Sequence, residues 1–235
     1  MAGALLEAQE VRVAAFRDRR EAGQLLARKL GQYANRDDVL VLALPRGGVP
    51  VAFEVAEALN APLDVFPVRK LGVPGNEELA MGAVAGGGVR VLNEDVVHAF
   101  GVTEQELEAV TARELDELRR RERLYRGERS PLEVHGRTVV IVDDGLATGA
   151  TMRAAVAALR EMGAQEIVVA VPTAAPSSCR EFEERVATVV CVITPEPFFG
   201  VGLWYQDFSQ TSDGEVSELL ERSARRQQRR SGEDA

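Results

Sequence analysis

The chain has 235 residues and a net charge of −9, from 28 basic and 37 acidic side chains. This length suits one sizeable α/β domain, and the acidic balance argues against a general binder of the nucleic-acid backbone. The same balance leaves room for a small anionic ligand, because local fields outweigh net charge.

Short β-rich runs alternate with amphipathic stretches along the chain. The expected elements, in order, are a helix at 19–32, a strand at 39–44, a helix at 49–59, a strand at 63–68, a weakly patterned glycine-rich segment over 70–90, a helix at 103–126, a strand at 138–143, a helix at 149–162, a strand at 166–171, a helix at 176–185 and a strand at 188–193. Thr103 and Glu106 have the spacing of a capping box, which marks the start of the long charged helix.

Several of the predicted strands are apolar at nearly every position, for example "VLVLAL" and "IVVAV". Strands buried on both faces have this composition, and the valine and isoleucine content favours strand over buried helix. The sequence therefore predicts an α/β fold with a mostly parallel sheet flanked by helices. The polar stretch 223–235 has no apolar face, so we expect a disordered tail there.

The N-terminal stretch, the apolar runs and the two cysteines indicate where in the cell we expect the protein. Glu7 and Glu10 interrupt the apolar N-terminal stretch, so we expect no secretory signal there. No apolar run approaches the roughly 20 residues of a membrane helix, and we expect no membrane partner. Cys179 and Cys191 lack the spacing of a metal site, so we expect separate thiols in a reducing cytoplasm.

The stretch "VVIVDDGLATGATM", residues 139–152, carries the clearest chemistry. Asp143 and Asp144 follow a buried strand, where ligands of open α/β sheets bind, and adjacent strand residues face opposite ways. Two carboxylates there can accept hydrogen bonds from sugar hydroxyls and favour a nearby positive charge. A small-residue loop follows and leads into a helix N-terminus, which suits a phosphate. Its members are Ala147, Thr148, Gly149, Ala150 and Thr151. Together these features outline a site for ribose 5-phosphate.

This stretch resembles the phosphoribosyl pyrophosphate motif of the type I phosphoribosyltransferases: four apolar residues, two acidic residues and a Thr-Gly-x-Thr loop. Two further segments fit that family in order. "ALPRGGVP", with Arg46, Gly47 and Gly48, is similar to its pyrophosphate loop. "VRKLGVPGNEELAMGAV" matches the place of its flexible catalytic loop, where Arg69 and Lys70 could neutralise the leaving pyrophosphate.

The aromatic stretch over 195–208 resembles the hood that covers the acceptor base in this family. The resemblance implies base or hood roles for Trp204, Tyr205 and Asp207, with the hood spanning about 195–215 together with an N-terminal segment. It also implies a single phosphoribosyltransferase-like domain over 1–222, with the long helix about 103–127 as an insertion.

The resemblance implies transfer of ribose 5-phosphate from phosphoribosyl pyrophosphate to a nitrogenous base, with release of pyrophosphate, as in purine and pyrimidine salvage. The implied cofactor is Mg²⁺, held mainly by the diphosphate and near Asp143 and Asp144. Ala147 stands where hypoxanthine–guanine enzymes carry an aspartate, which weighs against a 6-oxopurine acceptor. Such enzymes are often homodimers.

Two other functions remain open from the sequence. Some relatives bind phosphoribosyl pyrophosphate or a nucleotide as regulators and catalyse nothing, and an intact lid with Arg69 and Lys70 favours the enzyme. An unrelated sugar-phosphate hydrolase would need a nucleophile or base beside the phosphate loop, where 143–151 offers only aspartates.

Overall fold

A five-stranded parallel sheet forms the centre of this computed structural model, which describes residues 16–127, 129 and 132–233. The expectation for the N-terminal stretch 1–15 lies outside the described residues. The strand order is β2-β1-β6-β7-β8. The strands are β1 (Val39–Ala43), β2 (Leu63–Val65), β6 (Thr138–Val142), β7 (Glu166–Thr173) and β8 (Thr188–Ile193).

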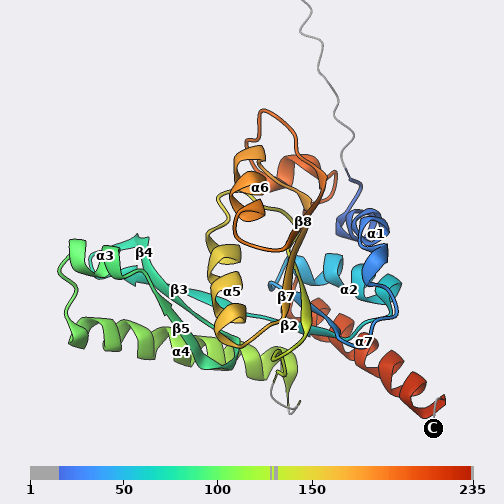
Figure 1. The fold of residues 1–235 in the computed structure, drawn as a ribbon, viewed down its shortest axis with the longest axis horizontal. Coiled ribbons are helices and arrows are strands. Elements are labelled where there is room, and N and C mark those ends of the chain that lie inside the picture. Colours follow the sequence, from blue (N-terminus) through green and yellow to red (C-terminus); the bar gives the residue numbers. More distant parts are fainter. Residues whose placement is uncertain (1–15, 128, 130–131, 234–235) are drawn as a thin grey trace, which may run out of the picture.

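Helices cover both faces of this sheet (Figure 1). Alternate strand residues such as Val41 and Val140 pack with α1, α2 and α7, while Leu42 and Ile141 pack on the other face with α5 and α6. Burial on both faces explains why these strands are apolar throughout. The helices are α1 (Arg19–Lys29), α2 (Gly48–Leu59), α5 (Ala150–Glu161), α6 (Pro176–Glu183) and α7 (Asp213–Glu233), and short 3-10 turns η1 (Gly31–Tyr33), η2 (Gly86–Gly88) and η3 (Val201–Trp204) complete them. The predicted α/β fold class is confirmed, and each predicted helix and strand is present with ends displaced by at most three residues.

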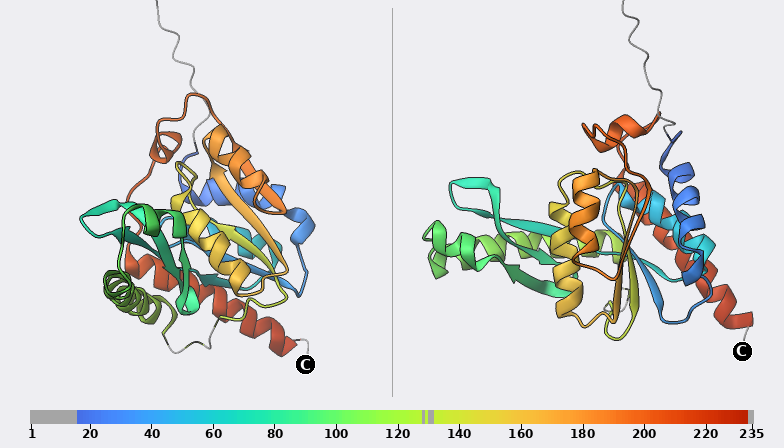
Figure 2. Two further views of the ribbon diagram at one scale, coloured as in Figure 1. Left: turned by 60° about the vertical axis from the view of Figure 1, so that its left-hand side comes forward. Right: turned by 45° about the horizontal axis from the view of Figure 1, so that its top comes forward.

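A second, antiparallel sheet and two helices project from the body as an arm (Figures 1 and 2). The arm consists of β3 (Val68–Val73), β4 (Asn76–Ala85), β5 (Val89–Leu92), α3 (Glu94–Ala99) and α4 (Glu104–Arg126). The glycine-rich segment expected to be a loop thus forms paired strands. Leu71, Met81 and Val84 build a separate core with Leu107 and Val110 of α4, which stabilises strands whose own pattern is weak. The predicted capping box of Thr103 and Glu106 is present at the start of α4.

Two expectations for other segments are wrong. The chain from Ser223, expected to be disordered, continues α7 to Glu233, because Val216, Leu220 and Ser223 are buried on one side of this helix. Cys179 of α6 and Cys191 of β8, expected to be separate thiols, form a disulfide, since β8 lies beside α6 although 12 residues separate the two cysteines. Within the described residues, no helix combines the length and apolar content needed to cross a membrane.

Candidate functional site

The twin aspartates and the glycine pair meet at the carboxyl edge of the parallel sheet. Ala43 of β1 pairs with Val142 of β6, so the loops that follow these two strands begin side by side. A Cβ on Gly47 would overlap the Asp144 carboxylate. The structure therefore brings together two segments that lie almost a hundred residues apart in the sequence, and it shows why a glycine is needed at 47.

Both aspartates are partly shielded from solvent, and their pKa values reflect this. Burial, and then the adjacent Asp144, raise the pKa of Asp143 well above the usual aspartate range, although the Asp144 backbone N–H donates to its Oδ1 at 2.8 Å. Burial also raises the pKa of Asp144, and Arg19 opposes that rise. Perturbed carboxylates of this kind are common in functional sites.

Arg19 at the start of α1 is a site residue that sequence reasoning missed. Its Nε and Nη2 lie 2.9 and 2.8 Å from Oδ2 of Asp144. The guanidinium also lies over the Phe208 ring, with 4.0 Å between Cζ and the ring centroid. In the sequence Arg19 is one of many arginines, 125 positions from its partner, so no local signal could have identified it.

The small-residue loop is anchored by two further residues that the sequence did not single out. Gly149, with φ of +71°, precedes α5, so the free N–H groups of the first turn face the loop. Arg153 of α5 donates to the Thr148 carbonyl oxygen at 2.8 Å, and the Ser178 hydroxyl of α6 donates to the Ala147 carbonyl oxygen. Ala147 and Thr148 are exposed, which leaves this side of the loop accessible to an anion.

Arg46 in the glycine-pair loop faces the start of α7. Its Nη1 lies 3.8 Å from Oδ1 of Asp213, which also accepts a hydrogen bond from the Tyr125 hydroxyl at 2.6 Å. The bond between Pro45 and Arg46 is cis. This distance is longer than that of a strong charge-assisted hydrogen bond, so Asp213 holds the guanidinium only weakly.

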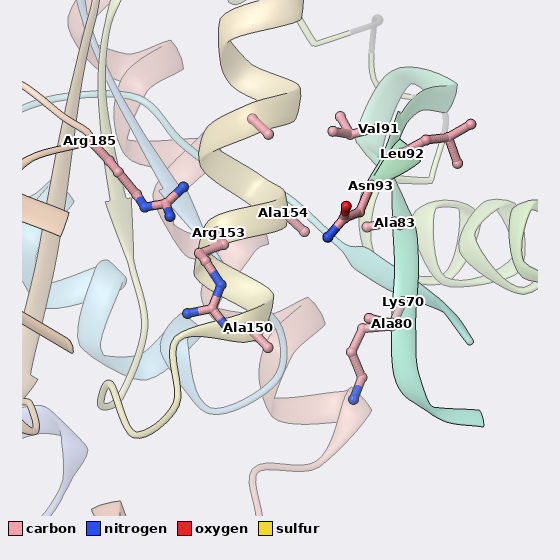
Figure 3. A pocket seen from close by; sticks show the side chains of 12 residues that line it. Lys70, Ala80, Ala83, Val91, Leu92, Asn93, Ala150, Arg153, Ala154 and Arg185 are labelled. Carbon is pink, nitrogen blue, oxygen red and sulfur yellow. The ribbon is translucent and has the colours of Figure 1, made fainter. Parts of the chain in front are cut away.

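The structure separates the two cations of the predicted lid. Arg69 donates from Nε to Oε2 of Glu114 on α4 at 2.9 Å, so its guanidinium is engaged within the arm. Lys70 points to the opposite side, as strand alternation requires, and lines a cavity of about 360 Å³ between the arm and α5 (Figure 3). Arg153 lines the same cavity from α5. Only Lys70 of the predicted pair is thus available to a ligand beside α5.

The hood joins the C-terminal part of the chain to the N-terminal part. Phe16 bridges to Tyr205, whose buried hydroxyl donates to the Asp144 carbonyl oxygen at 2.6 Å. Trp204 stacks on Phe198 at 6.5 Å between ring centroids. Exposed Asp207 accepts a hydrogen bond from the Ser209 backbone N–H at 2.9 Å. Of the three predicted hood residues, Tyr205 therefore contacts the twin-aspartate segment directly.

Val201 of the hood also packs on the twin-aspartate segment. A Cβ on Gly145 would overlap the Val201 side chain. A glycine at this position therefore lets the hood approach the sheet edge closely.

The carboxyl edge suits a magnesium ion that arrives with a diphosphate. The described residues contain no cluster of three or more His, Cys, Asp or Glu side chains able to hold an ion by themselves. Mg²⁺ commonly binds one or two carboxylates together with waters and substrate phosphates. Asp143 and Asp144 supply such a pair, so this donor set fits an ion held mainly by its substrate.

Known proteins resemble this chain along most of its length. The model of the phosphoribosyl transferase domain family matches residues 14–207. A protein of Mycobacterium tuberculosis strain H37Rv, named "Putative phosphoribosyl transferase Rv0571c", is 50% identical over 210 residues, which are 89% of this chain and 47% of that protein. The chain thus spans about half the length of the curated relatives it matches.

A solved structure is similar to this chain in both sequence and fold. The crystal structure of TT1426 from Thermus thermophilus is 44% identical, with a TM-score of 0.78, and the match covers 88% of this chain and 97% of that one. The chain therefore belongs to the phosphoribosyl transferase domain family.

Proposed function

We propose that this chain transfers ribose 5-phosphate from phosphoribosyl pyrophosphate to a nitrogenous base or a related nucleophile and releases pyrophosphate. One observation carries the proposal: the twin aspartates, the Gly47 loop and the 147–151 loop share one edge of the parallel sheet. These three features can hold, in turn, the ribose hydroxyls, the diphosphate and the 5-phosphate of one donor molecule.

The 5-phosphate binds first in this scheme, at the loop before α5. Helix N–H groups and the partial positive charge of the helix N-terminus favour the phosphate. Ser178 and Arg153 fix the Ala147 and Thr148 carbonyl groups, so the loop needs little rearrangement when the phosphate arrives. Binding energy far from C1 of the ribose then positions the reacting atoms.

Bond breaking occurs at C1 of the ribose. The C1–O bond to pyrophosphate breaks and its electron pair leaves with the diphosphate, while a lone pair of the acceptor forms the new bond to C1. When the acceptor nitrogen carries a proton, that proton passes to the departing diphosphate. Positive charge grows on the ring in between, and ionised Asp143 or Asp144 favours it electrostatically. Mg²⁺, when bound, would neutralise charge on the leaving diphosphate, with Arg46 and Lys70 as the cations that this chain contributes.

The arm supplies a reason to expect transfer rather than sensing alone. Lys70 lies on the arm face that borders the α5 cavity, so an inward movement of the arm would bring a cation toward the donor and exclude water. Arg69 stays with Glu114 in this scheme and holds the arm together. We therefore assign the lid cation to Lys70.

Pyrophosphate release tests the proposal. The chain is incubated with phosphoribosyl pyrophosphate, Mg²⁺ and a panel of bases, and release that depends on one base supports transfer and identifies the acceptor. Asp144→Asn should strongly reduce this release, while its thermal unfolding midpoint should stay close to that of the wild type. Donor binding without release for any base would favour the sensor, and absence of donor binding would overturn both.

A further inference from the structure

We infer that Arg19 is a positioning residue that holds the Asp144 carboxylate in the orientation needed by the ribose hydroxyls and links it to the hood. The inference rests on the proposed function, since it assigns Arg19 a task in donor binding. Arg19 contacts no expected substrate group itself and acts through Asp144.

The contact uses one oxygen of Asp144 and leaves the other available. Both Nε and Nη2 of Arg19 donate to Oδ2, at 2.9 and 2.8 Å. Among the described residues, no side chain of another residue donates a hydrogen bond to Oδ1 of Asp144 or to Oδ2 of Asp143. Each aspartate therefore keeps one oxygen for a ligand, and the position of Asp144 is fixed without closing the site.

Arg19 is held in place on its other side by the hood. Its Nη1 donates to the Ser209 carbonyl oxygen at 2.7 Å, and its guanidinium stacks on Phe208. The Arg19 side chain is 11% exposed and that of Asp144 is 16% exposed, so the pair is shielded from competing water. A buried guanidinium with donors committed on both sides has few alternative positions, which makes it a rigid support for the carboxylate.

The hood holds the same aspartate through its backbone as well. Tyr205 donates its hydroxyl to the Asp144 carbonyl oxygen, while Arg19 connects the Asp144 side chain to Ser209 and Phe208. Side chain and backbone of Asp144 are thus both tied to residues of the segment 205–209. If the hood moves when an acceptor binds, this movement would therefore shift the Asp144 carboxylate directly.

Calorimetric titration of the full chain in Mg²⁺ tests this role with three ligands: phosphoribosyl pyrophosphate, ribose 5-phosphate and 2-deoxyribose 5-phosphate. The wild type should bind the donor and prefer ribose 5-phosphate over the 2-deoxy sugar, because the twin aspartates accept from vicinal hydroxyls. Arg19→Gln should lower donor affinity about 10- to 100-fold, the range expected when a ligand loses a hydrogen bond to a charged group. It should also shrink the preference for the 2-hydroxyl toward equality.

Arg20→Gln is the matched control, since it removes the same charge from the same helix turn. Arg20 pairs with Glu54 at 3.2 Å and is 75% exposed, so this variant should match the wild type with all three ligands. Arg19→Lys keeps the charge but not the planar group, and it should lie between the wild type and Arg19→Gln in donor affinity and in sugar preference. The lysine variant also keeps the test decisive if the glutamine variant folds poorly.

The outcomes separate the inference from the proposed function. If Arg19→Gln weakened the binding of both sugar phosphates equally, the preference for the 2-hydroxyl would be unchanged and Arg19 would have a structural role only. Wild-type donor affinity and sugar preference in Arg19→Lys would also overturn the inference. Failure of the wild type to bind phosphoribosyl pyrophosphate would overturn the proposed function itself, before any variant is compared.

Discussion

The two ends of the parallel sheet carry aspartates in opposite electrostatic environments. At the amino end, hydrogen bonds from Arg36 and Thr138 lower the pKa of Asp38 to about 2. At the carboxyl end, burial and the neighbouring Asp144 raise the pKa of Asp143 well above its usual range. The carboxylate at the amino end has strong donors for both oxygens and stabilises the fold, whereas the one at the carboxyl end keeps an oxygen available. One strand layer thus provides a stabilising end and an end at which we propose that the donor binds.

Gly47→Ala should have the largest effect at the carboxyl end. The added Cβ would overlap the Asp144 carboxylate and lie 3.4 Å from the Arg19 Nε, so the carboxylate must move. We expect phosphoribosyl pyrophosphate to bind about 100-fold more weakly, because the displaced carboxylate would lose hydrogen bonds to the ribose that are worth about 3 kcal/mol. Calorimetric titration in the presence of Mg²⁺ measures the affinity.

Gly31→Ala is the control for this prediction, because a Cβ there meets no other atom within 4 Å. It should bind the donor like the wild type. Wild-type affinity in the Gly47→Ala protein would show that the glycine loop and Asp144 do not act together on the donor.

Arg69→Met and Lys70→Met should separate the part of the arm that stabilises the fold from the part that acts in pyrophosphate release. Arg69→Met removes one of the two ion-pair partners that the described residues give the buried Glu114, the other being Arg113, and we expect a loss of about 1–2 kcal/mol in the free energy of unfolding. Lys70→Met should leave that free energy unchanged and reduce pyrophosphate release about 10-fold or more, as for loss of one group that stabilises transition-state charge. Chemical denaturation and the release assay measure the two effects. The opposite pattern, with Lys70→Met destabilising and Arg69→Met inactive but stable, would assign the lid cation to Arg69.

Ser178→Ala should have a smaller effect, through the phosphate loop. The Ser178 hydroxyl holds the Ala147 carbonyl group, and a hydrogen bond of this kind contributes about 1 kcal/mol. Donor affinity should therefore fall about fivefold, since 1.4 kcal/mol corresponds to a factor of ten. Ser177→Ala, on the exposed side of the same helix, is the matched control. Equal affinities in the two variants would mean that the loop needs no support from α6.

The segment at the centre of the proposed site could be recognised from sequence, because the strand, the two aspartates and the small-residue loop lie within fourteen residues. The alternation of buried strands and helices likewise predicts the parallel sheet. The arm could not be predicted in the same way, since glycines interrupt β3 and β4 and the apolar partners of these strands lie on α4, some thirty residues later.

Contacts between segments that are distant in the sequence also could not be predicted. Arg19, Arg153 and Ser178 act through pairs that only the fold creates, and each is an ordinary helix residue by local pattern. The difference between Arg69 and Lys70 follows from strand alternation, which becomes readable only once β3 and its neighbours are placed. The part of α7 beyond Ser223 was missed because the buried apolar residues of this helix, Val216 and Leu220, lie near its start, before the polar stretch.

Asp38→Asn at the amino end of the sheet should have the smallest effect, and only on acid stability. The pKa of Asp38 in the fold, about 2, is below its unfolded value, so its ionised form stabilises the protein at pH above about 4. That stabilisation is lost as the pH falls from about 4 toward 2, and Asp38→Asn should lack this part of the pH dependence while binding the donor normally. Urea denaturation at pH 7 and pH 3 measures it, with Asp37→Asn as control because Asp37 contacts Arg137 through its backbone oxygen. A loss of donor binding in Asp38→Asn would contradict the view that the amino end of the sheet only stabilises the fold, since it would make this end part of the binding site.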